Sequence, residues 1–136
     1  MGLMHTHSGF AYLWMINSAL SVLIAGLVLA VGPKPGLMRA GRVVGQRLEL
    51  ALGGIVGLAG LVLPFVSPLY GWTSGFVWLG LLAFLASTVL TVLGIKPAWR
   101  AAQQGRQDVY TRWFGFAVAN LTVVYGAFWL MHAKPF

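Results

Sequence analysis

The sequence contains no cysteine and only two acidic residues, Glu49 and Asp108. The missing thiols exclude disulfides, thiolate metal sites and cysteine nucleophiles. Two acidic residues leave almost no material for hydrolysis by paired carboxylates, and the chain has no glycine-rich phosphate loop, HExxH or GxSxG motif. We therefore expect no hydrolase, and any metal or cofactor has to be bound by histidine, methionine, carboxylate or backbone groups.

Charge of either sign is scarce. Charged residues make up 8% of the 136 residues, 59% are hydrophobic, and the mean hydropathy is +0.83, which is typical of a membrane protein. Four apolar stretches, 9–31, 46–65, 74–95 and 111–131, are each long enough to cross a hydrocarbon core of about 30 Å. We predict a single transmembrane domain, 1–136, with the all-α fold of an integral membrane four-helix bundle.

Eight of the nine basic residues lie in two connections, 32–45 and 96–110, and at the adjoining span ends. The connection between the second and third spans carries no charge. The positive-inside rule places both basic loops in the cytoplasm and both termini on the periplasmic side of a bacterial inner membrane. The positive charge is thus a topology signal, and we expect the lipid bilayer, not nucleic acid, as the partner.

Small residues recur at helical spacing in each predicted span, which places them on one face of each helix. Such lines allow close helix packing, and the alternative is that they make room for a flat cofactor such as a porphyrin. In the order of the spans, the lines are His7, Ala11, Trp14, Ser18, Ser21 and Ala25; Glu49, Gly53, Gly57, Gly60 and Pro64; Gly80, Ala83, Ser87, Thr91 and Gly94; and Ala117, Asn120, Val124 and Ala127.

Glu49 lies about one turn inside the second span, where an unpaired charge costs about 2.5 kcal/mol or more. We expect an ion pair with a basic residue on the same side of the membrane, namely Arg42, Arg47 or Arg112. Such a pair would fix the second span against the fourth. The alternative is that Glu49 transfers protons near a quinone or a channel.

The three histidines lie towards the two ends of the chain: His5 and His7 before the first span, and His132 after the fourth. In the expected topology His7 and His132 share one depth near the outer face, and two neutral imidazoles that face each other can bind haem iron axially. We predict a haem b site held by this pair. The alternative is that the rings lie at headgroup level with their polar atoms in water. The apolar wall of the haem site would comprise Tyr12, Trp14, Phe128 and Trp129.

Methionine lies next to two of these histidines, and a set of imidazole and thioether ligands suits Cu(I). The sequence therefore also allows a copper site at the outer face in place of haem. The copper ligands would be Met4, His5, His7, Met131 and His132.

Several patches of sequence carry a resemblance to a known group. They are HTHSGFAYL at the first span, GQRLELALGGIVGLAGLVL after the basic loop, SPLYGW in the outer turn and GIKPAWRAAQQG after the third span. The chain resembles the small four-helix bacterial membrane proteins of the CopD-like, SirB-like and b-type cytochrome-like kind. Members that hold haem b use histidines on facing helices, so the resemblance implies His7 as a ligand. The second and third spans have no histidine here, which excludes the usual two-haem arrangement.

These observations lead to one expected function and two alternatives. We expect a polytopic inner-membrane protein with a haem b or metal site at its outer face, acting in electron transfer or as a subunit of a respiratory or oxidoreductase complex. Its partners would be other membrane subunits or a second copy of the chain, with a quinone as the small molecule. The alternatives are a non-catalytic packing subunit of a larger membrane complex and periplasmic copper binding or handling.

Overall fold

The computed structural model describes residues 2–66, 71–73 and 75–133, and all regular structure in that part of the chain is helical. There are four helical stretches, two of which contain a π-helical segment. In chain order the elements are α1 (Gly2–Val31), α2 (Pro35–Arg42), η1 (Val43–Leu48), α3 (Glu49–Val66), α4 (Gly75–Val89), η2 (Leu90–Ile95), α5 (Lys96–Gln103) and α6 (Asp108–Ala133). The predicted all-α fold is confirmed.

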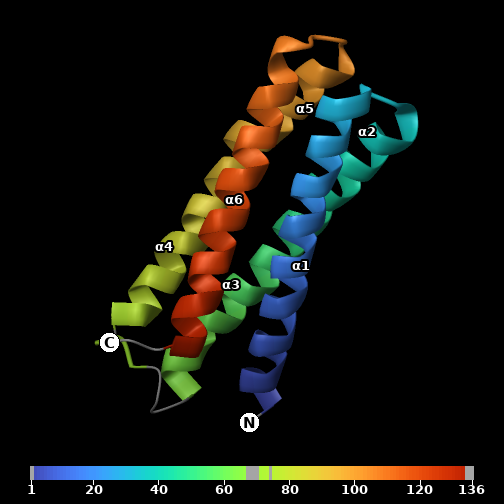
Figure 1. Cartoon of the computed structure of the whole chain (residues 1–136). Helices are drawn as coiled ribbons and strands as arrows, with labels where there is room; N and C mark the ends of the chain where they lie inside the picture. The colour runs from blue at the N-terminus through green and yellow to red at the C-terminus, as the bar shows by residue number, and fades with distance from the viewer. Residues whose placement is uncertain (1, 67–70, 74, 134–136) are drawn as a thin grey trace.

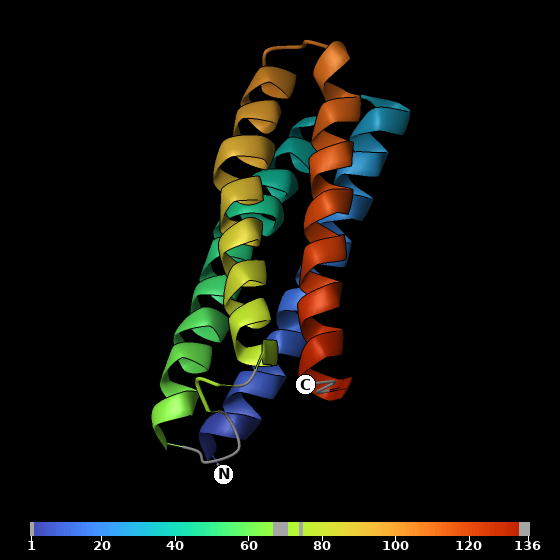
Figure 2. The same cartoon turned by 90° about the vertical axis from the view of Figure 1, so that its left-hand side faces the viewer.

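The four stretches form an elongated antiparallel bundle (Figure 1). The helix α1 packs against α3 and α6, and α4 packs against the same two helices, so the stretches surround one axis (Figure 2). We call the end where α1 begins and α6 ends the terminal end, and the opposite end, made by α2 and α5, the basic end.

Four helical stretches among the described residues are long and apolar enough to cross a membrane. They are His7–Val31, Pro35–Val66, Val77–Gln103 and Asp108–Leu130. The predicted spans agree with them in number and order, except that residue 74, where the third predicted span begins, lies outside the described residues.

The two basic connections are mostly helical, so their prediction as loops, 32–45 and 96–110, was wrong. The helices α2 and α5 are amphipathic: their basic side chains lie outside, and each buries small or apolar residues against the bundle. The remaining turns are short, and Gly32 and Gly105 occupy them with φ of +90° and +83°. Glycine adopts this left-handed conformation without a steric penalty. The inward residues of α2 and α5 are Met38, Gly41, Ala98, Trp99 and Ala102.

Two apolar clusters make up the core. The first, at the basic end, is built around Trp99 and Trp113, and the second surrounds Trp14 nearer the terminal end. Between them lies a layer of buried polar residues, whereas large leucines such as Leu58 and Leu93 face outwards. This distribution is what a bundle surrounded by lipid requires, because only the outward surface meets the hydrocarbon.

Aromatic rings from neighbouring helices occupy the space that the small residues leave. A Cβ atom added to Gly57 would lie 2.8 Å from the Phe84 ring, and one added to Gly53 would lie 3.2 Å from Trp14. Gly94 approaches Phe116 in the same way, at 2.7 Å. The small-residue lines therefore serve packing of aromatic side chains at these positions, as the packing interpretation predicts.

An equally close approach, between Gly41 and Trp113, leads to a test. The Trp113 ring is 1% exposed, and a Cβ on Gly41 would lie 2.7 Å from it. We expect Gly41→Ala to lower the free energy of unfolding by about 1–3 kcal/mol, because the enclosed ring cannot move aside. Unfolding in mixed detergent micelles, followed by tryptophan fluorescence, measures this change.

The matched control is Gly36→Ala in the same helix, where an added Cβ meets nothing within 4 Å. We expect its effect to stay within about 1 kcal/mol and to favour the helix, because alanine has the higher helix propensity. Equal destabilisation by the two variants would contradict the packing described for Gly41.

Candidate functional site

The most unusual side chain in the bundle is the carboxylate of Glu49, which is 2% exposed. Glu49 begins α3 and lies near the middle of the second helical stretch. Two groups of α1 reach its Oε1 atom: the indole Nε1 of Trp14 donates at 2.8 Å and the hydroxyl of Ser18 at 2.6 Å. The amide Nδ2 of Asn17 donates to Oε2 at 2.8 Å, and that of Asn120, on α6, donates to Oε1 at 2.7 Å.

A π-helical turn positions this carboxylate. In a π-helix each backbone N–H bonds five residues back, which widens the helix locally. The turn η1 ends directly before Glu49, and its Val44 carbonyl accepts a second hydrogen bond from Asn17 Nδ2 at 2.8 Å. Asn17 thus bridges the backbone of η1 and the carboxylate, and it fixes the rotation of the helix at the level of the site.

The third helical stretch joins the network through Asn120. The hydroxyl of Ser87 donates to Asn120 Oδ1 at 2.6 Å, and the hydroxyl of Thr91 donates to the Ser87 carbonyl at 2.9 Å. All of these side chains are buried. The network therefore connects all four helical stretches at mid-height of the bundle. The second π-helical segment of the chain, η2, contacts η1 at this level.

The predicted ion pair of Glu49 with Arg47 or Arg112 was wrong. Arg42, Arg47 and Arg112 are all exposed, and among the described residues the ion pair present joins Arg106 to Asp108, at 3.1 Å. Arg47 precedes Glu49 by two residues, which on a helix places the two side chains on roughly opposite sides. Glu49 faces the axis of the bundle, where no described arginine reaches it. Its oxygens accept hydrogen bonds from neutral groups instead.

Four neutral donors can keep a carboxylate inside an apolar bundle. A buried carboxylate without hydrogen bonds or a counter-ion is very unfavourable, and donated hydrogen bonds replace the lost water. An ionised carboxylate accepts only, whereas the hydroxyl of Ser18 can donate or accept. Rotation of that hydroxyl therefore allows the same site to hold a carboxylate or a protonated carboxyl.

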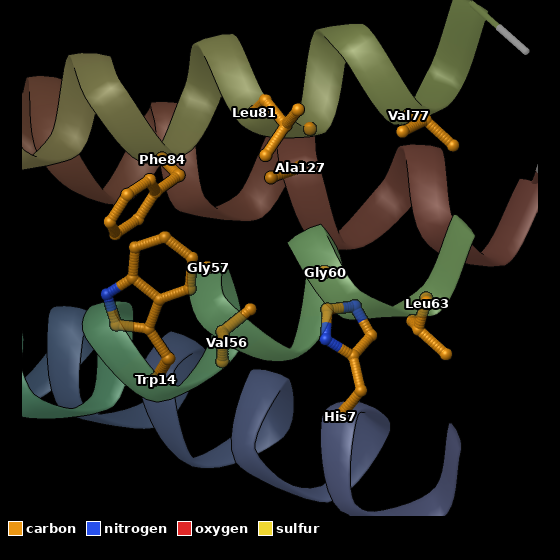
Figure 3. A pocket seen from close by; sticks show the side chains of 11 residues that line it. His7, Trp14, Val56, Gly57, Gly60, Leu63, Val77, Leu81, Phe84 and Ala127 are labelled. Carbon is orange, nitrogen blue, oxygen red and sulfur yellow. The ribbon is translucent and has the colours of Figure 1, made fainter. Parts of the chain in front are cut away.

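His7 lies at a cavity between the Glu49 network and the terminal end (Figure 3). Its ring points towards α3, where a Cβ added to Gly60 would lie 3.5 Å from His7 Cε1. The cavity has a volume of about 60 Å³, and its wall also includes the indole of Trp14. His7 and Trp14 lie on the same face of α1. The cavity lies between the His7 ring and the Trp14 indole, which donates a hydrogen bond to Glu49.

His132 lies in different surroundings. It is exposed, its Nδ1 lies 3.0 Å from the Phe128 carbonyl, and its Nε2 lies 3.3 Å from the Tyr12 hydroxyl. The His132 ring packs on Phe128 and at the edge of Tyr12, with centroids 4.2 and 5.6 Å apart. Tyr12 follows His7 by about 140° around α1, so His132 approaches α1 away from the side to which His7 points.

The residues predicted for haem b do not fit that group. His132 is not among the described residues that line the cavity beside His7, and this cavity is far below the roughly 300–1,000 Å³ of ligand pockets. Trp14 of the predicted wall is buried and bonded to Glu49, whereas Tyr12 and Trp129 are about half exposed. We therefore assign no electron-transfer step to a haem between His7 and His132.

The copper site stays a prediction. The side chains of Met4 and Met131 lie outside the described part of the structure, and His5 is exposed at the terminal end. Within the described residues, no group of three or more histidine, cysteine, aspartate or glutamate residues could hold a metal ion.

The sequence analysis did not identify the hydrogen-bond donors of Glu49, and so it did not predict a site at this position. Asn17 and Asn120 are the two asparagines of the chain, and both donate to the same carboxylate. Their rarity within apolar spans is the signal that pairs them with Glu49, because a polar side chain in lipid has to find a polar partner.

Comparisons with known proteins give no further guide: no protein-family model, curated protein or solved structure matches this chain. The resemblance to CopD-like, SirB-like and b-type cytochrome-like bundles therefore stays a prediction.

Asn120 provides a test of the network. We expect Asn120→Ala to lower the free energy of unfolding by about 1–2 kcal/mol, because it removes a donor to Glu49 and the acceptor of Ser87. The control is Thr122→Ala on the same helix, since this exposed hydroxyl donates to the Val118 carbonyl of its own helix and to no other described residue. A loss no larger than that of the control, measured by unfolding in mixed micelles, would contradict a stabilising role for the network.

Proposed function

We propose that the protein is a membrane subunit in which Glu49 binds and releases a proton at mid-depth of the bilayer, as part of a respiratory or other oxidoreductase complex. One observation carries the proposal: a buried carboxylate receives four hydrogen bonds from neutral groups and no ion pair from a described residue. An ionisable residue inside a membrane is rare and is usually functional.

The surroundings of Glu49 support a proton rather than another ligand. Protonation removes the buried charge and leaves the carboxyl with one O–H to donate, and Ser18 can then accept that bond. A ligand larger than a proton could reach Glu49 only if the four donors moved apart. A proton is therefore the species that the site can exchange with the smallest rearrangement.

Polar groups on both sides of Glu49 support a route for that proton. Towards the terminal end a cavity of about 60 Å³ lies between Trp14 and His7, the two polar side chains of an otherwise apolar wall; a volume of this size has room for water, and these two groups would be its polar partners. Towards the basic end lies the buried hydroxyl of Ser21. Such a file of polar groups is what proton transfer through an apolar bundle requires.

The positive-inside rule supports a position in the bacterial inner membrane, with the basic end in the cytoplasm and the terminal end facing the periplasm. In this orientation the proposed role is to supply or remove protons for a redox reaction on a partner subunit or on a quinone. The redox group itself is assigned to the partner, because the histidines of this chain do not fit the haem predicted for them.

The second candidate is a non-catalytic assembly subunit in which Glu49 only fixes the arrangement of the helices. The connection of all four stretches to one carboxylate favours it, since buried polar groups can specify a register without any chemistry. The two candidates differ in whether Glu49 changes its protonation state.

Infrared spectroscopy distinguishes them, because Asp108 is the only other acidic side chain. We expect a protonated-carboxyl band that changes with pH, shifts in D₂O and disappears in Glu49→Gln. The matched control, Asp108→Asn, should retain the band, since Asp108 is exposed and lies outside the network. A protein in bilayer discs that shows no such band at any pH at which it stays folded would reject the proton role and leave the assembly role.

A further inference from the structure

A second site lies at the basic end, separate from the Glu49 network. A cavity of about 320 Å³ opens between the η1 segment and α5. Four of its residues are cationic and none is acidic, so the cavity gathers positive charge with no counter-ion from its own wall. The residues that line it are Arg42, Gln46, Arg47, Leu50, Lys96, Trp99, Arg100 and Gln103.

Gln46 is an independent observation at the same cavity. Its side chain is 7% exposed, and its Nε2 atom is buried without a hydrogen-bond partner among the described residues. A buried amide N–H with no acceptor costs about 1–3 kcal/mol. Because this atom has almost no surface open to water, an acceptor oxygen in the cavity would remove this cost once the amide rotates towards the opening.

The arginine at the edge of the cavity is held in place. Trp99 donates from Nε1 to the Met38 carbonyl at 2.8 Å, which fixes its indole. The guanidinium of Arg42 lies over that indole, 5.8 Å from the ring centroid. Such stacking orients the charge before a ligand arrives and reduces the entropy lost on binding.

We propose that this cavity binds a phosphate group, with the phosphate oxygens accepting from Gln46 Nε2 and from the surrounding guanidinium and ammonium groups. Arginine and lysine together with a neutral N–H donor are the usual recognition set for phosphate. The group belongs to an anionic phospholipid or to a free phosphate, which share this chemistry. Basic pockets between membrane helices on the cytoplasmic side bind lipid headgroups in this way, and Leu50 offers an apolar edge beside the charges.

Native mass spectrometry of the full chain tests the proposal. Delipidated protein is offered phosphatidylglycerol or phosphatidylcholine with the same acyl chains, and the retained lipid is counted. We expect selective retention of phosphatidylglycerol. The double variant Arg47→Gln/Arg100→Gln should lower the apparent affinity about tenfold or more, because it removes two charge-assisted contacts. Both arginines are exposed, so these changes do not enter the core.

Two further variants make the result specific. The control Arg106→Gln/Arg112→Gln removes the same charge from the rim of a different cavity at the same end, and it should retain the lipid. Gln46→Met preserves size but removes the amide donor, and it should weaken binding with the helix content by circular dichroism unchanged.

Inorganic phosphate added as a competitor separates the two sources. Displacement of the lipid by millimolar phosphate would indicate a site for free phosphate, and resistance to it would indicate a headgroup site. Either result supports a phosphate site. Equal retention of the two lipids together with no effect of phosphate, or an equal loss in both double variants, would overturn it.

Discussion

The Glu49 carboxyl group accepts hydrogen bonds from neutral groups of α1 and α6, and each of those groups has to point towards the axis of the bundle to reach it. The rest of the structure is arranged around this requirement. The π-helical turn η1 brings Glu49 inwards, Asn17 bonds both that turn and the carboxylate, and Ser87 orients the amide of Asn120. Removal of one member therefore leaves others without a partner in a region that water reaches poorly.

This central layer divides the bundle into two halves with different chemistry. The half towards the terminal end is apolar, with a small cavity and His7. The half towards the basic end carries arginine and lysine on its outer surface. It also contains the positively charged cavity, which is larger than the cavity beside His7. This division is the one that the positive-inside rule predicts for a membrane protein, in which cationic side chains are retained on one side and apolar helix ends cross to the other.

The spans and their inward faces could be predicted from the sequence, because hydrophobicity and the spacing of small residues depend on local pattern alone. The inward lines through Ala11, Ser18 and Val124 are buried as expected. The polar contacts could not be predicted, because they depend on how far each helix is rotated. Glu49 was paired with arginines at the same end of the spans, whereas its donors are neutral groups of α1 and α6. The geometry of the predicted haem pair depends on the same rotation, since a shared depth does not by itself make His7 and His132 face each other.

The winding of the second helical stretch has a consequence for how its buried residues are spaced. Gly41, Gly45, Glu49, Gly53 and Gly57 recur every fourth residue, and all five are buried. On a regular α-helix each such step drifts by about 40°, so the first and last would lie nearly on opposite sides. The turn η1 winds more slowly and takes up part of that drift. A helix that followed this four-residue repeat without such a turn would have to coil around its neighbours in a right-handed sense; here the unwinding is concentrated in one turn, and the bundle needs less supercoiling.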